Sequence, residues 1–472
     1  MPKSITSTQP PLQFIPHKYN PLVVKLLHGI LPMILRFRTR PWLPAGIVRV
    51  EAENAEVLAE LYQQFQAGKI RLLMAFRHPE VEDPLCVLYM LSRIVPRVAR
   101  QQGIKLQSPI HSHFLFDRGM TIWAGDWLGW LFSRLGGVPV RRGRRLDKQA
   151  IQTARNLFAH GKLPIAVAPE GGNNGHSGIV SHLEPGVAQM GFWCVEDLHK
   201  ANRSETVVIV PISIQYHYIQ PPWLKLDWLL SKLEADSGLS VQSIGDGANQ
   251  PEVYYQRICR LGEYLITEME EFYRRFYHQD IPKAIASEAS ATPNEVLIAR
   301  LHRLLDTGLQ VAEQYFGVQP QGNFIDRCRR LEEASWNYIY RDDLPDINAL
   351  PPFKRGLADW VAQEASLRVQ HMRLVESFVA VNATYLQAQP TADRFAETAL
   401  LMFDMLSRIQ SSTLPGRPRL GLRRAELKVG EPISVTERWE KVQHDRQAAK
   451  RAVSKLTQDL QVALEELINQ SI

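Results

Sequence analysis

Cysteine is scarce in this 472-residue chain, which has four cysteines, all far apart in the sequence. No two of them form a Cys-x-x-Cys pair, which argues against a zinc site and against a disulfide framework. Such sparse usage fits a reducing compartment, so we expect a cytoplasmic protein. The cysteines are Cys86, Cys194, Cys259 and Cys328.

Long apolar runs are also lacking, and the first residues show no signal peptide. The most apolar early stretch, 21–35, is shorter than the roughly 20 residues that a membrane-spanning helix needs, and Lys25, His28 and Pro32 interrupt it. Several arginines and Trp42 follow, which favours a segment lying on a membrane surface. A helix docked on the protein's own core is the alternative.

The positive charge of the chain is modest. A net charge of +6 indicates an anionic partner without naming it. A prediction of nucleic-acid binding would be supported only by this charge and by the run RRGRR (141–145). The sequence has no recognised nucleic-acid-binding module and no interleaved aromatic residues, so we expect no nucleic-acid partner. The length predicts two or three domains of an ordinary globular protein.

Short strand-like runs alternate with helical stretches between residue 47 and about residue 214. These runs are apolar throughout, which is typical of strands buried in a parallel sheet. Helical periodicity dominates from about 250 to 410. The fold class that we predict is α/β, a mainly parallel sheet flanked by helices, with a large all-helical insertion or C-terminal helical domain. The expected strands are 47–50, 72–76, 138–140, 163–168 and 207–214.

His78 and Asp83 are the first candidates for chemistry, because they follow the expected strand 72–76 and α/β folds bind ligands where strands end. Imidazole can accept a proton near neutral pH, and a carboxylate on its other nitrogen would orient it. No nucleophilic Ser or Cys lies near in an elbow motif, so His78 would activate the substrate's own hydroxyl. The structural alternative is that Asp83, before Pro84, caps a helix.

Three further segments each have a functional and a structural interpretation. The run GGVPVRRGRR (136–145) could bind a phosphate or be a solvated basic loop. The glycine-rich segment 168–178 would let a ligand approach the backbone, although it matches neither common phosphate-binding loop. The segment VPISI (210–214) is typical of a plain buried strand.

The order of these four segments resembles the lysophosphatidic acid and glycerol-3-phosphate acyltransferase family. That family has a His-x4-Asp block, a Gly-x5-Arg block, a Pro-Glu-Gly block and a Val-Pro-Ile block. The resemblance covers roughly residues 45–220. The matching residues are His78 to Asp83, Gly136 to Arg142, Pro169 to Gly171 and Val210 to Ile212.

The resemblance implies an O-acyltransferase of phospholipid biosynthesis, peripherally associated with a membrane. His78 would be the general base that activates the acceptor hydroxyl, oriented by Asp83. The acyl donor would be a thioester of coenzyme A or of acyl carrier protein, and the acceptor a glycerol-phosphate or a lysophospholipid. No cofactor or metal is implied. The substrate-binding residues implied are Arg141, Arg142, Glu170, Gly171, Gly172 and Pro211.

Two blocks depart from the family pattern. Gly172 and Asn173 stand where the family usually has Thr or Ser and then Arg, so one phosphate-binding arginine is missing. An acceptor hydroxyl without a terminal phosphate therefore stays open. In the first block, Arg77 replaces a frequent Asn, and Glu80 and Glu82 make the block acidic.

The strand-like segment KVGEPI (428–433) resembles a part of the family fold that usually follows the fourth block. We therefore expect a helical insertion at 231–415, between a core at 45–230 and a returning strand and final helix at 416–472. Residues 1–44 would be a membrane-associating segment. An independent C-terminal helical domain is the rival organisation. The alternative function is a non-catalytic relative that binds lipid or a partner protein through its helical region.

Overall fold

The computed structural model divides the chain into two compact units. The sheet unit contains the described residues from 15 to 220 and from 421 to 469, and the helical unit contains those from 7 to 14 and from 221 to 420. The structure describes residues 7–12, 14–40, 43, 45–121, 125–140, 147–242, 250–282, 291–344, 346–379, 381, 384–410, 416–441 and 445–469.

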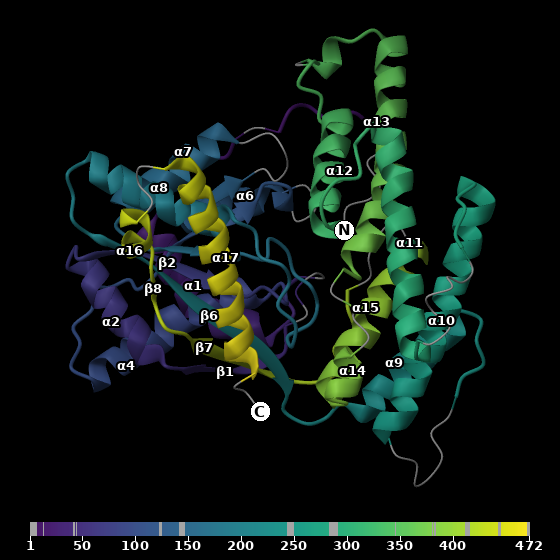
Figure 1. Ribbon diagram of the computed structural model, residues 1–472, viewed down its shortest axis with the longest axis horizontal. Helices are drawn as coiled ribbons and strands as arrows, with labels where there is room; N and C mark the ends of the chain where they lie inside the picture. Colours follow the sequence, from purple (N-terminus) through teal and green to yellow (C-terminus); the bar gives the residue numbers. More distant parts are fainter. Residues whose placement is uncertain are drawn as a thin grey trace. The chain divides into compact units, whose positions relative to one another are not determined.

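The sheet unit is built on a sheet with helices packed on it (Figure 1). Among the described residues the sheet has eight strands. Its order is β1-β7-β6-β2-β5-β3-β4, with β8 beside β6. Strands β2 to β6 run parallel to one another, whereas β7 is antiparallel to β6 and parallel to β1. The predicted mainly parallel sheet is confirmed. The strands are β1 Ile47–Glu53, β2 Ile70–Phe76, β3 His113–Asp117, β4 Gly137–Val140, β5 Ile165–Val167, β6 Thr206–Tyr218, β7 Arg423–Val429 and β8 Ile433–Ser434.

Both faces of the sheet are buried. Leu72 and Met74 of β2 belong to the core on one face, while Leu73 and Ala75 belong to the core on the other. Helices α1 to α4 supply the first core, and α7, α8 and α17 the second. The helices are α1 Pro21–Arg36, α2 Ala55–Gln66, α3 Asp83–Tyr89, η1 Met90–Ile94, α4 Val95–Gln101, α6 Asp126–Arg134, α7 Lys148–His160, α8 Gly186–Lys200, α16 Thr436–Glu440 and α17 Arg446–Asn469.

The helical unit has its own apolar core, in which Leu309, Leu331 and Ala362 are fully buried. Capping boxes begin α11 at Thr292 and α12 at Asn323, which satisfies backbone N–H groups at both helix starts. The predicted large helical region is confirmed. Its helices are α9 Trp223–Asp236, α10 Gln250–Tyr277, α11 Pro293–Phe316, α12 Phe324–Ile339, η3 Ile347–Ala349, α13 Pro352–Glu376, α14 Tyr385–Ala388 and α15 Ala392–Gln410.

The helical unit is inserted, in sequence, between two strands that pair directly. Tyr218 at the end of β6 pairs with Arg423 at the start of β7. Just beyond them, the N–H of Ile219 donates to the carbonyl oxygen of Leu422 at 2.9 Å. The chain therefore leaves the sheet after β6 and returns to it beside the same strand.

Helix α1 has two apolar faces. One face is buried in the core of the sheet unit through Val24, Leu27, Leu31 and Leu35. This face therefore docks on the protein's own core, as the alternative interpretation expected. The other face keeps large apolar side chains at the surface. No helix among the described residues is long and apolar enough to cross a membrane. The exposed apolar residues of α1 and its C-cap are Leu22, Leu26, Ile30, Met33 and Phe37.

Two histidine pairs join the segment around α1 to the segment where β3 begins. Nε2 of His17 lies 3.3 Å from Nδ1 of His113, and Nε2 of His28 lies 3.4 Å from Nδ1 of His111. Burial lowers the pKa of His28 to about 4 and that of His111 to about 3. The described residues contain no group of three or more His, Cys, Asp or Glu side chains arranged to bind a metal. Each pair therefore joins a partly buried histidine to a buried one, and the low pKa values of His28 and His111 keep these two neutral near pH 7.

We expect acid to weaken the sheet unit between pH 6.5 and pH 4. Unfolded histidines take up protons below about pH 6.5, whereas folded His28 and His111 stay neutral down to about 4 and 3. The folded state thus binds fewer protons in this window, and the free energy of unfolding should fall by about 2–4 kcal/mol as the pH drops. Urea titrations at several pH values measure the slope. The variant His111→Gln should reduce the dependence of the free energy of unfolding on pH, whereas the control His278→Gln, at an exposed histidine, should leave it unchanged. An unchanged pH dependence in His111→Gln would show that the buried histidines do not cause the effect.

Candidate active site

Neighbouring parallel strands bring the expected catalytic blocks to one edge of the sheet. Ala75 of β2 lies beside Val167 of β5, and Phe76 lies beside Ile212 of β6. The segments that follow β2 and β5 therefore start at the same edge. In open α/β sheets ligands bind outside the carboxyl ends of the strands, so this edge is the place for an active site.

His78 and Asp83 face each other at this edge. Nδ1 of His78 lies 3.1 Å from Oδ2 of Asp83. The carboxylate has no exposure to solvent, whereas the imidazole keeps 21% of its side-chain surface exposed. Because Nδ1 faces the carboxylate, Nε2 is the nitrogen that can accept a proton from a substrate.

The interpretation of Asp83 as a helix cap is wrong. Helix α3 begins at Asp83 with Glu82 at the N-cap, and no side chain bonds to its first turn. Asp83 instead accepts a hydrogen bond from the N–H of Glu80 at 2.7 Å and another from the Tyr216 hydroxyl. Burial raises the pKa of Asp83, and the bonds from His78 and Tyr216 oppose that rise.

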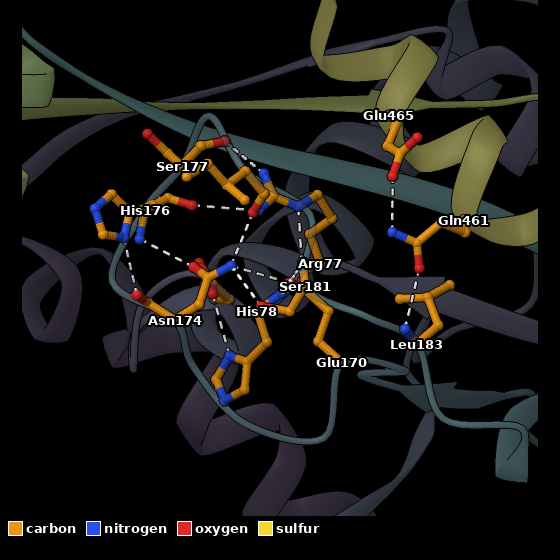
Figure 2. Close-up of polar contacts among 12 residues, drawn as sticks. Arg77, His78, Glu170, Asn174, His176, Ser177, Ser181, Leu183, Gln461 and Glu465 are labelled. Carbon is orange, nitrogen blue, oxygen red and sulfur yellow. Dashed lines mark hydrogen bonds and ion pairs between the residues drawn. The ribbon is translucent and has the colours of Figure 1, made fainter. Parts of the chain in front are cut away.

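Glu170 joins the glycine-rich loop to the end of β2 (Figure 2). Its Oε1 accepts the N–H of His78 at 2.9 Å. Its Oε2 accepts the N–H of Ser181 at 2.8 Å and Nδ2 of Asn174 at 3.2 Å. The buried carboxylate thus holds the His78 backbone and both ends of the loop.

Arg77 binds the same loop (Figure 2), and its guanidinium is completely buried. It donates to the carbonyl oxygens of Ser177 at 2.5 Å, His176 at 3.3 Å and Ile179. Its Nε lies 3.6 Å from Oε1 of Glu170. The sequence analysis did not predict that Arg77 holds this loop. The signal that could have indicated it was the arginine at position 77, where the family frequently has asparagine.

The predicted glycines shape the loop. Gly171 has a φ of +71° and Gly175 a φ of +72°, a region that side-chain-bearing residues rarely adopt. The N–H of Gly175 donates to the carbonyl oxygen of Pro79 at 3.0 Å, which holds the loop against the segment that follows His78. Gly172 lies between them and is partly buried.

A comparison with known protein families found a match to the part of the chain that contains His78, Asp83 and Glu170. The family model described as acyltransferase matches residues 49–215. The match is to the phospholipid/glycerol acyltransferase domain family and covers less than half of the chain. This family carries out acyl transfer, with an acyl donor and a lipid acceptor. Among the curated proteins, none matches the chain.

The acyltransferase domain contains Pro211 within β6, opposite Ala75 of β2. Pro211 is buried, and its carbonyl oxygen accepts the N–H of Gly430 at 2.9 Å. The other predicted ligands, Arg141 and Arg142, lie outside the described residues, directly after the end of β4.

A charged network lies next to the His78–Asp83 pair. Arg423, from β7, places its guanidinium nitrogens 3.5 Å from Oε1 of Glu80 and 3.4 Å from Oε1 of Glu82. Burial raises the pKa of Glu82 to about 7, and Arg423 opposes that rise. The acidic first block therefore has a cationic partner that the sequence pattern did not reveal.

Replacing Arg77 by lysine should loosen the loop, because one ammonium group cannot reach three carbonyl oxygens in a fixed plane. We expect the free energy of unfolding to fall by about 2–4 kcal/mol. Backbone amides in residues 171–181 should exchange with solvent faster, as hydrogen exchange followed by mass spectrometry would measure.

The matched control is Arg71→Lys, on β2, the strand that Arg77 directly follows. Arg71 is also buried and donates to the carbonyl oxygens of Phe158 at 2.6 Å and Gly161 at 2.8 Å. Both variants should lose stability, and Arg77→Lys alone should speed exchange in the loop. Equal loop exchange in the two variants would refute the assignment.

Proposed function

We propose that this protein transfers a fatty acyl group from a thioester donor to a hydroxyl of a glycerol-phosphate or lysophospholipid acceptor. The observation that carries the proposal is the 3.1 Å approach of His78 to a fully buried Asp83. The reaction class comes from the acyltransferase domain, residues 49–215. The chemistry of the pair supports a general-base mechanism.

In this mechanism Nε2 of His78 takes the proton of the acceptor hydroxyl as its oxygen attacks the thioester carbonyl carbon. Asp83 stabilises the imidazolium that forms. The tetrahedral intermediate then loses its carbon–sulfur bond, and the leaving thiolate takes the proton from His78. An ester and a free thiol result, with no net change in protons, so the step needs no metal or redox cofactor.

The acceptor would be held by the loop after β5 and by the arginines after β4. The oxygens of Glu170 bind backbone and side-chain groups of the protein, which favours a loop-shaping role for this residue. Asn173 stands where the family has an arginine, so a phosphate on the acceptor would depend on Arg141 and Arg142. The donor would be the thioester of coenzyme A or of acyl carrier protein.

Replacing His78 by alanine should lower the rate of acyl transfer by about 10³-fold, because the general base is lost. Purified protein would be offered both thioesters with glycerol-3-phosphate, lysophosphatidic acid, lysophospholipids and neutral acylglycerols. Exposed His160→Ala, in the same unit, is the control and should keep the native rate.

Full turnover by the His78→Ala variant would rule out the proposed mechanism. No turnover by the native protein with any acceptor, in the presence of lipid vesicles, would instead favour the non-catalytic relative that binds lipid or a partner protein.

We also propose that the protein is cytoplasmic and binds a membrane surface through α1 and the neighbouring α6. The exposed apolar residues of α1 are joined on α6 by Trp127 and Trp130, which are 41% and 53% exposed. Arg40 and Arg134 lie over these two rings, at 4.6 and 4.3 Å from the ring centres. Tryptophan and arginine beside an apolar stripe suit an anionic lipid interface.

The double substitution Leu26→Asp and Met33→Asp should lower binding to vesicles rich in anionic lipid by at least about tenfold, because charge replaces the inserted apolar surface. Co-sedimentation measures the bound fraction. The control carries Phe353→Asp and Trp360→Asp, two exposed apolar positions on α13 of the helical unit. Equal loss in both variants, or no loss in the first, would exclude α1 as the membrane-binding surface.

A further inference from the structure

The carboxylate of Asp83 is held by both of its oxygens. Oδ2 faces Nδ1 of His78 at 3.1 Å and accepts the N–H of Glu80 at 2.7 Å. Oδ1 accepts the hydroxyl proton of Tyr216. A carboxyl group rotates easily about its last side-chain bond, so a donor on each oxygen is what holds it in one orientation.

Tyr216 reaches Asp83 because β6 continues past the part that pairs with β2. Ile212, Ile214 and Tyr216 follow one another at every second residue and belong to the same core face. Tyr216 pairs with Ala425 of β7 and is buried. The guanidinium of Arg423 lies 4.9 Å from the centre of its ring. The ring is therefore enclosed, and its hydroxyl is directed at the dyad.

We propose that Tyr216 is a positioning residue for the His78–Asp83 dyad. This inference rests on the proposed function, in which the dyad is catalytic. Tyr216 acts through Asp83: its hydroxyl fixes Oδ1, so that Oδ2 stays against His78 while the imidazole gains and loses its proton. Loss of the hydroxyl would free the carboxylate to turn and would reduce the fraction of His78 in the productive orientation.

The surroundings of Asp83 set the direction of the expected pH effect. The groups that face it are His78 and Glu80 from the segment before α3, Cys86 from α3 and Tyr216 from β6, with Glu82 and Arg423 beyond them. Burial raises the pKa of Asp83, and the Tyr216 hydroxyl is among the groups that lower it. Removing that hydroxyl should therefore protonate Asp83 at a higher pH.

The test compares Tyr216→Phe with Tyr62→Phe. Tyr62 is equally enclosed in the sheet unit, and its hydroxyl donates to the carbonyl oxygen of His111 at 2.8 Å, away from the dyad. Each substitution removes one buried hydrogen bond to oxygen, and Tyr216→Phe also removes a weak contact with Sγ of Cys86 at 3.6 Å, so the two variants should lose similar thermal stability. Tyr216→Phe alone should lower kcat by about tenfold with KM within about twofold, and should move the acid limb of its pH–rate profile to higher pH.

A double-mutant cycle adds a readout that a packing defect would not give. In the background of Asp83→Asn, the substitution Tyr216→Phe should cause no further loss of kcat, because Tyr216 acts through the carboxylate of Asp83, which this background lacks. Additive losses would overturn the proposal, as would kinetics of Tyr216→Phe that match those of Tyr62→Phe. Full turnover by His78→Ala would overturn the proposed function and the role of Tyr216 with it, whereas the preceding results would overturn the role of Tyr216 alone.

Discussion

Two buried guanidinium groups hold the segments around His78 in place. Arg77 binds three carbonyl oxygens of the loop after β5, and Arg423 lies between the carboxylates of Glu80 and Glu82. A cation removed from water is tolerated when its charge and its donors are matched, and removing a partner is costly. Each arginine therefore fixes the segments that surround it, and together they hold the segment that contains His78 and Asp83.

Much of the fold could be predicted because it depends on local patterns. Continuous apolar runs identified β2, β5 and β6, since a strand buried on both faces needs apolar side chains on both. The end of β2 then located His78. Asp83 was harder, because Asp before Pro fits a helix cap as well as a dyad, and the observed helix takes Glu82 as its N-cap.

The partners of the dyad could not be read from one sequence. Tyr216 lies 133 positions from Asp83, and Arg423 lies 341 positions from Glu82. Contacts of this kind depend on strand order, which periodicity does not report. The expected strand ended at residue 214, whereas β6 continues to Tyr218, so the sequence analysis did not place Tyr216 in the sheet. The acidic first block looked anomalous because its counter-ion comes from a strand far along the chain.

The insertion of the helical unit between β6 and β7 also orders events in time during synthesis. Strand β7 lies between β1 and β6 in the sheet, yet it follows β6 by roughly 200 residues. At 5–20 residues per second, the ribosome needs about 10–40 s to make that length of chain. Throughout this interval Glu80 and Glu82 exist without Arg423, and the sheet has no strand to join β1 to β6. The sheet therefore lacks β7, and Glu80 and Glu82 lack their cationic partner, until the helical unit has been made.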